Sequence, residues 1–552
     1  MKSRWYKDAV IYQIYPRSFC DGDGDGIGDI RGIISKLDYL QDLGVDAVWL
    51  SPCYKSPNDD NGYDISDYRD IMDEFGTLDD WQEMIDGMHA RGIKLIMDLV
   101  VNHSSDEHEW FKQSRSSKDN PYRDYYFWRK GRGKNGKKPP NNWRGNFLGS
   151  AWAYDETTGE WYMHLFSKKQ PDLNWDNPKV RQEVVDICNY WFEKGVDGFR
   201  CDVITYISKN QGLKDGKNPF NPLRGEENYC LGENWEKYIA EVNRESWSKY
   251  DSLIVGECAG INYEQAKQIA DETKPVLDTL FNFEHMFVDF VGKFKLSKFK
   301  KIVARYQQMP RTVWTSNYLE NHDQPRCIPR YVDGAEEYRK YGATMLATVN
   351  MMLRGTPYIY QGQEIGMTSC PLEEDEYKDI MSINVIKMLN KHKIIKKLGM
   401  KILSKKARDN ARTPMQWSGE QYAGFSTVEP WMKVNPNYVD INVEKDRESE
   451  FSIFEYYKNL IAKRKQVSRI LADGEWREYY EKSNQVWVFS RKLGDAYVYV
   501  EANYGKELVE IDDRYTMDTT DAELLVCNYK YCEENTHIHT LRPYEARVYV
   551  KK

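Results

Sequence analysis

Three acidic residues follow short apolar segments and together have the chemistry to cleave a glycosidic bond. Asp202 lies in GFRCDVI, Glu257 in VGEC and Asp323 in ENHDQP. Each carboxylate stands where an apolar run gives way to polar residues, and a barrel of parallel strands places its active site at such positions. Two carboxylates that flank a bond, one as acid and one as nucleophile or base, are the minimum equipment for glycoside hydrolysis. With Arg200, His103 and His322 beside them, they predict a convergent acidic pocket in an enzyme.

Eight apolar segments of strand length must position these side chains. Charged segments of helix length, such as TLDDWQEMIDGMHARG, separate most of them, which is the alternation expected of a parallel sheet covered by helices. Eight strands close an α/β barrel. The eight segments are VIYQIYP, VDAVWLS, KLIMDLVV, VDGFRCDV, SLIVGE, LDTLFNFE, VWTSNYLEN and TPYIYQGQE. The predicted fold is therefore α/β, a (β/α)8 TIM barrel.

Two departures from the alternation predict additional domains. About ninety residues separate KLIMDLVV from VDGFRCDV, far more than one crossover helix requires. We interpret 104–175, which is rich in Trp, Tyr, Asn and Gly, as an inserted domain after the third strand, between barrel parts 1–103 and 176–475. Beyond 475, alternating segments such as QVWVFSRK and DAYVYVEANY follow without intervening helices. We expect a C-terminal antiparallel β domain over 476–552.

Composition excludes several classes of partner. The chain has 552 residues with 41% hydrophobic and 30% charged residues, which is ordinary for a globular protein. Its formal charge of −8 disfavours nucleic acid as a partner, because phosphate neutralisation needs clustered Lys and Arg. The one basic run noted, 131–140, is interpreted as a solvated loop. No segment has the length and hydropathy of a membrane span, so no membrane partner is expected.

The termini and cysteines indicate an intracellular protein. The N-terminus lacks the apolar core of a signal peptide. Ten scattered cysteines form neither a disulfide-rich composition nor the paired spacing of a zinc site. Cys201 and Cys258, which we interpret as small buried residues, stand beside the acidic residues and suit a reducing compartment. We expect a cytoplasmic monomer or weak homo-oligomer.

Together, DLVVNHSS, GFRCDVI, VGEC and ENHDQP resemble the four signature regions of the α-amylase superfamily, glycoside hydrolase family 13. The resemblance is ordered along nearly the whole chain. It implies that Asp202 is the nucleophile, Glu257 the general acid and base, and Asp323 the stabiliser of the transition state. It also implies that Arg200 holds the nucleophile ionised. The mechanism is then retaining, with the carboxyls of Asp202 and Glu257 about 5–5.5 Å apart.

Further segments resemble the oligo-1,6-glucosidase subfamily. They are QPDLN, NGYDISDY, ARDNARTPMQW and GFSTVEPW. In such enzymes an ion pair closes the end of the first subsite and restricts attack to the chain end, and the resemblance implies that Arg408 pairs with Asp64. Val203, directly after the nucleophile, favours α-1,6 over α-1,4 bonds in relatives, and a β-branched side chain there would restrict space beside the scissile oxygen. The substrate-binding residues implied by the resemblance are Tyr63, Asp64, His103, Phe166, Arg200, Val203, His322 and Arg408.

Two pKa expectations follow from these roles. A carboxylate beside a guanidinium stays ionised, which predicts an ionised Asp202. A general acid must hold its proton at neutral pH, which predicts a raised pKa at Glu257.

The loop DGDGDGIGD alternates acidic residues with glycine. Alternation lets hard oxygen ligands converge on one cation. The start resembles an EF-hand loop, although the closing Glu is absent because residue 32 is Gly. In the oligo-1,6-glucosidases this loop binds calcium, so a structural Ca²⁺ is the expected cofactor. Its implied ligands are Asp21, Asp23, Asp25, the carbonyl of Ile27, and Asp29.

Several alternatives remain open at this stage. Trehalose-6-phosphate hydrolase shares the fold and the catalytic trio but needs a cationic pocket for the phosphate. A sucrose isomerase is disfavoured because RCIPR stands where that group has RLDRD. An α-1,4-glucosidase on the same scaffold is a further alternative. An inactive relative that serves as a binding subunit is disfavoured because all three carboxylates are present.

Overall fold

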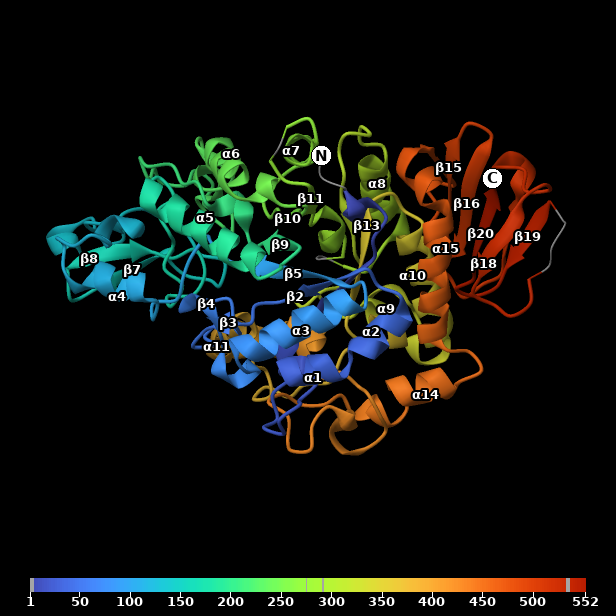
Figure 1. The fold of residues 1–552 in the computed structure, drawn as a ribbon, viewed down its shortest axis with the longest axis horizontal. Coiled ribbons are helices and arrows are strands. Elements are labelled where there is room, and N and C mark those ends of the chain that lie inside the picture. Colours follow the sequence, from blue (N-terminus) through green and yellow to red (C-terminus); the bar gives the residue numbers. More distant parts are fainter. Residues whose placement is uncertain (1–3, 275, 290–291, 533–536) are drawn as a thin grey trace.

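Eight parallel strands form the closed barrel at the centre of the molecule (Figure 1), seen in a computed structural model that describes residues 4–274, 276–289, 292–532 and 537–552. All eight predicted segments form strands. Their order in the sheet is β11-β10-β9-β5-β2-β1-β13-β12, and the Oγ atoms of Thr279 and Ser316 lie 3.3 Å apart across the remaining seam. The barrel strands are β1 (Ile11–Ile14), β2 (Ala47–Leu50), β5 (Lys94–Leu99), β9 (Gly198–Cys201), β10 (Leu253–Glu257), β11 (Thr279–Phe281), β12 (Ser316–Asn317) and β13 (Thr356–Tyr360).

The barrel strands are apolar along their whole length because both of their faces are buried. Every residue of β1, β2, β9 and β10 is buried, as expected of parallel strands with a filled interior on one side and helices on the other. The helices before residue 380 are α1 (Ile30–Ser35), α2 (Leu37–Leu43), α3 (Leu78–Ala90), α4 (Glu109–Ser116), α5 (Pro178–Glu193), α6 (Trp235–Glu245), α7 (Tyr263–Ile269), α8 (Leu296–Gln307), α9 (Cys327–Tyr331) and α10 (Ala335–Met351).

The inserted segment lies at one end of the molecule in Figure 1, beyond β5. A small antiparallel sheet in the order β6-β8-β7 organises it, with β6 (Trp128–Arg129), β7 (Trp152–Asp155) and β8 (Glu160–Met163). The segment returns to the end of β5, where Leu173 donates its backbone N–H to the carbonyl of Asn102. The short hairpin β3 (Tyr54–Lys55) and β4 (Asp67–Ile71) precedes β5. The insertion thus covers the barrel end that carries the predicted site.

The C-terminal segment forms the expected antiparallel sheet at the opposite end of the molecule (Figure 1). Its main sheet has the order β14-β15-β16-β20-β18, and β17 pairs with β19. The strands are β14 (Glu475–Tyr479), β15 (Val486–Leu493), β16 (Ala496–Asn503), β17 (Val509–Asp512), β18 (Glu523–Cys527), β19 (Ile538–Leu541) and β20 (Ala546–Lys551). The remaining helices are α11 (Ile380–Lys391), α12 (Lys393–Lys406), α13 (Asp409–Arg412), α14 (Val443–Glu448) and α15 (Ile453–Asp473). The division at 103, 175 and 475 stays a prediction.

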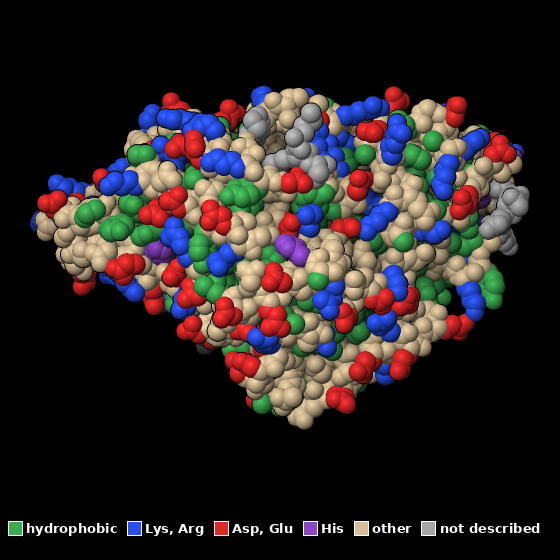
Figure 2. Space-filling model, viewed as in Figure 1, with side chains coloured by type: hydrophobic (Ala, Val, Ile, Leu, Met, Phe, Trp, Pro, Cys, Tyr) green, Lys and Arg blue, Asp and Glu red, His purple; other side chains and the backbone are tan. Residues whose placement is uncertain are grey.

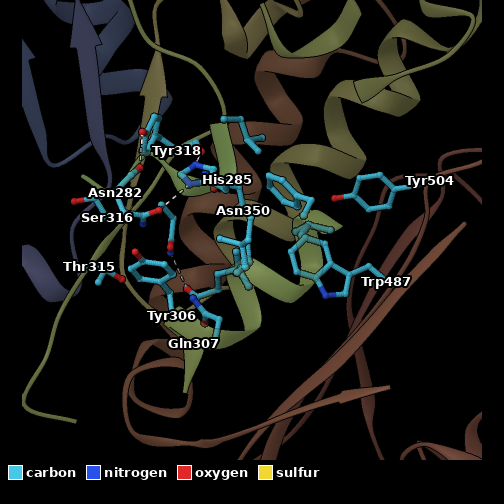
Figure 3. Close-up of a pocket in the computed structure, with 17 residues that line it drawn as sticks. Asn282, His285, Tyr306, Gln307, Thr315, Ser316, Tyr318, Asn350, Trp487 and Tyr504 are labelled. Carbon is cyan, nitrogen blue, oxygen red and sulfur yellow. Dashed lines mark hydrogen bonds between the residues drawn. The ribbon is translucent and has the colours of Figure 1, made fainter. Parts of the chain in front are cut away.

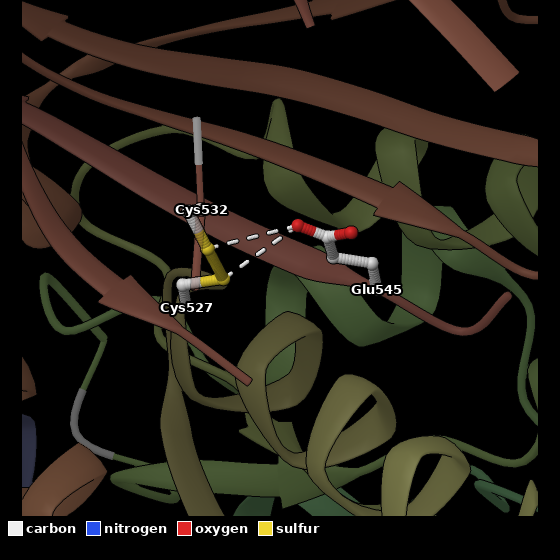
Figure 4. Close-up of side chains that lie close together, drawn as sticks. All are labelled: Cys527, Cys532 and Glu545. Carbon is white, nitrogen blue, oxygen red and sulfur yellow. Dashed lines mark hydrogen bonds between the residues drawn. A yellow bond between two sulfur atoms is a disulfide. The ribbon is translucent and has the colours of Figure 1, made fainter. Parts of the chain in front are cut away.

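A disulfide joins Cys527 and Cys532 in the C-terminal segment, which the sequence did not predict. The two sulfur atoms lie 3.6 and 3.7 Å from Oε1 of the buried Glu545 (Figure 4). The other eight cysteines are free thiols, and Cys201 and Cys258 are buried as expected.

A small cavity of about 30 Å³ lies between the barrel and the C-terminal sheet. Figure 3 shows Asn282 and His285 on one side of it and Trp487 and Tyr504 on the other. The volume accommodates one or two water molecules. It therefore belongs to the packing between barrel and sheet and includes none of the predicted catalytic residues.

Candidate active site

The guanidinium of Arg200 joins three carboxylates at the ends of neighbouring barrel strands. Its Nη1 lies 2.6 Å from Oδ1 of Asp202 and 2.8 Å from Oδ1 of Asp98, and its Nη2 lies 2.8 Å from Oε2 of Glu257. All four side chains are buried. They meet because β9 pairs with β5 on one side and β10 on the other, with Asp98 and Arg200 in direct register. Two of the three predicted catalytic residues therefore share one cation.

Burial sets the protonation of this group more than the cation does. It raises the pKa of Asp202 to about 7 and that of Asp98 to about 6, although Arg200 opposes both shifts. It also raises the pKa of Glu257 to about 7, against Arg200 and with the help of Asp202 and Asp323. The rise expected at Glu257 is present. Burial works against the ionisation expected of Asp202, because one guanidinium serves three buried carboxylates.

Val203 shapes the pocket through its backbone as well as its side chain. It adopts a left-handed conformation (φ 36°, ψ 40°), which is strained for a β-branched residue. Its N–H donates to Oε2 of Glu257 at 2.9 Å. Its side chain is buried in a cluster with Tyr206 and Trp143, against which Phe166 packs. The residue after the predicted nucleophile therefore orients the predicted acid.

A second cluster of charges, in which Arg408 and Asp323 are partly exposed, surrounds Arg408 and Arg412. Nη1 of Arg408 lies 3.1 Å from Oδ1 of Asp323, and its Nη2 lies 2.5 Å from Asp379 and 3.4 Å from Asp60. Arg412 contacts the same Asp323 oxygen at 2.8 Å and Asp379 at 3.1 Å. Three carboxylates here share two guanidinium groups.

The predicted ion pair between Arg408 and Asp64 is wrong. Asp64 instead accepts the hydroxyl of Ser56 and the backbone N–H groups of Asp59 and Asp60. Its carboxylate therefore shapes the loop, and the neighbouring Asp60 is the aspartate of this loop that reaches Arg408. The error arose because NDDNGYD offers three aspartates and the sequence does not show which one points inward.

Protonation in the second cluster differs between its members. Burial alone would raise the pKa of Asp323, but His322, Arg408 and Arg412 lower it well below its usual range. Asp60 lies farther from Arg408 than the other two carboxylates do, and burial raises its pKa to about 7. Asp323 is thus a fixed negative charge opposite the Arg200 group.

His322 and Tyr63 form a stacked pair between the two clusters. Their ring centroids lie 5.4 Å apart with planes 5° from parallel, and the Tyr63 hydroxyl lies 2.7 Å from Nε2 of His322. The side-chain amide of Gln13 lies 2.7 Å from Nδ1. Burial lowers the pKa of His322, and the neighbouring Asp323 opposes this shift. Tyr63 and His322 therefore lie at positions from which they can form the wall of the pocket.

His103 and Phe166 lie together on the side of the inserted segment. Their ring centroids are 5.1 Å apart, and Nε2 of His103 lies 3.1 Å from the carbonyl of Tyr63 and 3.2 Å from the amide of Gln170. Burial lowers the pKa of His103 to about 4. Phe166 also contacts Phe147, whose ring faces the guanidinium of Arg408. The segment QPDLN therefore reaches the pocket through Gln170.

Three of the four predicted metal-binding aspartates converge. Carboxylate oxygens of Asp21, Asp23 and Asp29 lie within 4.8 Å of one another, whereas Asp25 stands outside this group. Gly24 and Gly26 have φ of 85° and 92°, conformations that permit the tight loop. The loop lies between β1 and α1, which Asp29 caps by accepting the N–H of Gly32. An all-oxygen donor set fits Ca²⁺.

Four residues of the two clusters were missed from sequence alone. Asp98 opens the quoted segment DLVVNHSS, and Arg412 follows Arg408 by four residues in ARDNARTPMQW, a spacing that places both on one helix face. Asp60 adjoins NGYDISDY. Asp379 stands in no recognised motif, and only the tertiary structure reveals it.

The sequence from residue 13 to 474 matches the family described as alpha amylase, catalytic domain. The chain belongs to the α-amylase family. As a family member it is a glycoside hydrolase. It is 50% identical to the oligo-1,6-glucosidases of Parageobacillus thermoglucosidasius (covering 100% of this chain and 99% of the relative) and Bacillus cereus (100% of both).

Solved structures of other α-amylase family members share the fold over the whole chain. One is a trehalose-6-phosphate hydrolase of Bacillus licheniformis, 41% identical, with a TM-score of 0.93 over 99% of both chains. Another is the trehalulose synthase of Pseudomonas mesoacidophila, 37% identical, with a TM-score of 0.94 over 100% of both chains. The scaffold therefore supports more than one reaction on α-glucosides.

Proposed function

We propose that the protein is a retaining, exo-acting α-glucosidase that removes terminal, mainly α-1,6-linked glucose from isomalto-oligosaccharides and similar short glucosides. The observation that carries this proposal is the contact of both Asp202 and Glu257 with one guanidinium. Retaining enzymes need their two carboxyl groups close together, whereas inverting enzymes leave room for a water molecule between them.

The catalytic cycle uses one carboxylate as nucleophile and the other as proton carrier. Asp202 attacks the anomeric carbon while Glu257 donates its proton to the departing glycosidic oxygen, which gives a covalent glucosyl ester. Glu257 then removes a proton from a water molecule, and this water attacks the anomeric carbon. The attack displaces Asp202 and releases glucose with retained configuration. The fixed charge of Asp323 stabilises the oxocarbenium-like transition state.

Exo action rests on the second cluster. Arg408 spans Asp323 and Asp60 and lies over Phe147. Such a bridge would leave no passage for further sugar units past the terminal glucose.

The preference for α-1,6 bonds is supported by Val203, by QPDLN and by the names of the 50% identical relatives. The test is a kinetic panel of isomaltose, panose, maltose, sucrose, trehalose and trehalose-6-phosphate with the purified chain. We expect the highest kcat/KM for isomaltose and panose. A higher value for maltose would change the linkage assignment, and inactivity on every α-glucoside would overturn the proposal.

Trehalose-6-phosphate hydrolysis is the second candidate, because a solved hydrolase of this kind has the same fold at 41% identity. The substrate phosphate requires a free cationic side chain. Lys209, fully buried near His103, is already paired with Asp172 at 2.8 Å and with Asn102 at 2.7 Å. A preference for trehalose-6-phosphate over trehalose and isomaltose would favour this candidate, and formation of trehalulose from sucrose would favour a sucrose isomerase.

We propose that the loop 21–29 binds a structural Ca²⁺. Asp21, Asp23 and Asp29 would hold the ion with the carbonyl of Ile27, and Asp25 would have to turn inward to join them. Because an ion that binds only the folded state stabilises it, EDTA should lower Tm, and CaCl₂ but not MgCl₂ should restore it. An unchanged Tm in EDTA would refute the site.

The location and assembly of the protein are further parts of the proposal. Within the described residues no helix is both long and apolar enough to cross a membrane. We propose a cytoplasmic protein that is monomeric or weakly associated. Eight free thiols suit a reducing compartment, whereas the Cys527–Cys532 disulfide suits an oxidising one, so thiol titration of protein extracted under acid quench tests the location.

A further inference from the structure

The helical hairpin formed by α11 and α12 exposes an unusual concentration of apolar side chains. Among the described residues, six of the seventeen exposed large hydrophobic side chains lie within residues 380–406. Ile394 is 99% exposed and Leu398 is 63% exposed. The remaining four are Met381, Met388, Ile395 and Ile402.

These exposed residues are additional to the apolar face that holds the hairpin in place. Ile386 on α11 and Leu403 on α12 are buried together with Tyr377 and Ala407 in a small core of the hairpin. Ile394, Leu398 and Ile402, at i, i+4 and i+8, instead form a stripe along one face of α12. Within the part of the chain that the structure describes, this stripe has no apolar partner.

The hairpin is also the most basic segment of an acidic protein. Residues 380–406 contain eight lysines and no Asp or Glu, in a chain whose formal charge is −8. Lys396 pairs with Glu374 and Lys406 with Asp289, both at 2.6 Å. On the face drawn in Figure 2, by contrast, acidic and basic side chains are interspersed. The sequence-based view that 131–140 was the one basic run overlooked this segment.

The apolar stripe and the lysines together indicate which kind of partner the hairpin binds. On α12, a helix of 14 residues, lysines lie beside an apolar stripe, and this combination suits an anionic bilayer surface. There the apolar side chains would enter the acyl boundary and the ammonium groups would reach the lipid phosphates. A second copy docked by the same face would bring two sets of lysines together. A nucleic acid would contact the lysines but leave Ile394 and Leu398 exposed to water.

We propose that the α11–α12 hairpin is a docking surface that holds the enzyme on anionic lipid bilayers. This replaces the expectation of no membrane contact, which considered only spanning and signal segments. Both ends of the hairpin are anchored at the active site: Asp379 caps α11 and pairs with Arg408, which follows α12 by two residues. Docking would therefore hold the rim of the pocket at a constant distance from the lipid surface.

Vesicle co-sedimentation of the full chain tests the proposal. We expect binding to phosphatidylcholine vesicles that contain phosphatidylglycerol, and at least about tenfold weaker binding to phosphatidylcholine alone. Binding should weaken in high salt, because charge attraction at the headgroups is screened. Absence of binding to the anionic vesicles at low salt would overturn the proposal.

Two triple variants separate the apolar and charged contributions. I394S/L398S/I402S and K397E/K401E/K405E should each reduce binding at least about tenfold. The matched control L508S/Y515S removes two exposed apolar residues of the C-terminal segment and should leave binding unchanged. Hydrolysis of a soluble aryl α-glucoside should be equal in all variants, which shows that they are folded. If the first variant instead abolishes self-association and leaves vesicle binding intact, the hairpin is an interface between copies and the lipid proposal is wrong.

Discussion

The two charge clusters of the active site contain the same number of carboxylates but different numbers of cations. Around Arg200, the carboxylates of Asp98, Asp202 and Glu257 share one guanidinium. Around Arg408 and Arg412, those of Asp60, Asp323 and Asp379 share two. Burial raises the pKa of a carboxylate in either place, and the number of adjacent cations decides whether that rise is overcome.

This difference in the number of cations suits one cluster to proton transfer and the other to the stabilisation of charge. The pKa of Asp202 and that of Glu257 are raised to about 7, so this pair holds a transferable proton at neutral pH. The pKa of Asp323 is held well below its usual range, so this residue never competes for that proton. One catalytic trio thus obtains two kinds of carboxylate from the placement of three arginines.

The largest effect is expected from D202N. Removing the nucleophile prevents formation of the glucosyl ester, so kcat should fall on the order of 10⁴-fold or more. D98N, which alters the third carboxylate on Arg200 without touching the reacting carbon, should cost about 10²-fold at most. Steady-state kinetics on isomaltose, with circular dichroism to verify folding, measures both. Equal losses in the two variants would contradict the assignment of Asp202, and not Asp98, as the nucleophile.

E257Q should reduce kcat/KM for isomaltose by about 10²–10⁴-fold, because the leaving sugar is no longer protonated. The phenol of an activated aryl α-glucoside is acidic and can leave with little protonation. With this substrate, E257Q should therefore lose less of its glucosylation rate than with isomaltose. Comparison of pre-steady-state bursts on the two substrates checks this. A loss of the same size for both would argue that Glu257 is not the acid.

The pH profile of kcat/KM should be bell-shaped with its maximum near pH 7. Activity requires Asp202 without a proton and Glu257 with one. Protonation of Asp202 lowers activity below the maximum, and loss of the proton from Glu257 lowers it above, the pair titrating as coupled groups. In E257Q the alkaline decline should disappear while the acidic decline remains. An unchanged alkaline limb would assign it to another group.

R408A should lower kcat/KM for isomaltose by about 10²-fold, since it leaves the buried carboxylates of Asp60 and Asp379 without this cation. A double-mutant cycle then tests which aspartate is the partner. D60N combined with R408A should be strongly non-additive, whereas D64N combined with R408A should be close to additive. The opposite result would restore the pairing expected from sequence.

The smallest effect is expected from V203T, which keeps the shape of the side chain but replaces one methyl group by a hydroxyl. The ratio of kcat/KM for isomaltose to that for maltose should fall by up to about tenfold. I204V, a conservative change at the next buried position, serves as the control and should leave the ratio unchanged. An unaltered ratio in V203T would remove Val203 from the determinants of linkage preference.

Much of the scaffold was predictable because it depends on local patterns. Each barrel strand is a continuous apolar run, and all eight were found at the predicted segments. The ends of those runs carry Asp202, Glu257 and Asp323, so the candidate trio followed from strand position. Asp379 was not predictable, because it serves as the cap of α11 and gives no local sign that it faces two arginines.

The sequence by itself determined the barrel and its inserted and C-terminal segments, and it predicted the three carboxylates that we propose are catalytic. Only the tertiary structure decided that Arg408 meets Asp60 and not Asp64, that Asp202 shares its cation with two other carboxylates, and that the lysines of α12 surround an uncovered apolar stripe. Strand position is encoded in the order of apolar and polar residues. Which charges share a cation, and which apolar faces stay exposed, depend on elements that are distant in the chain and meet only when the barrel closes.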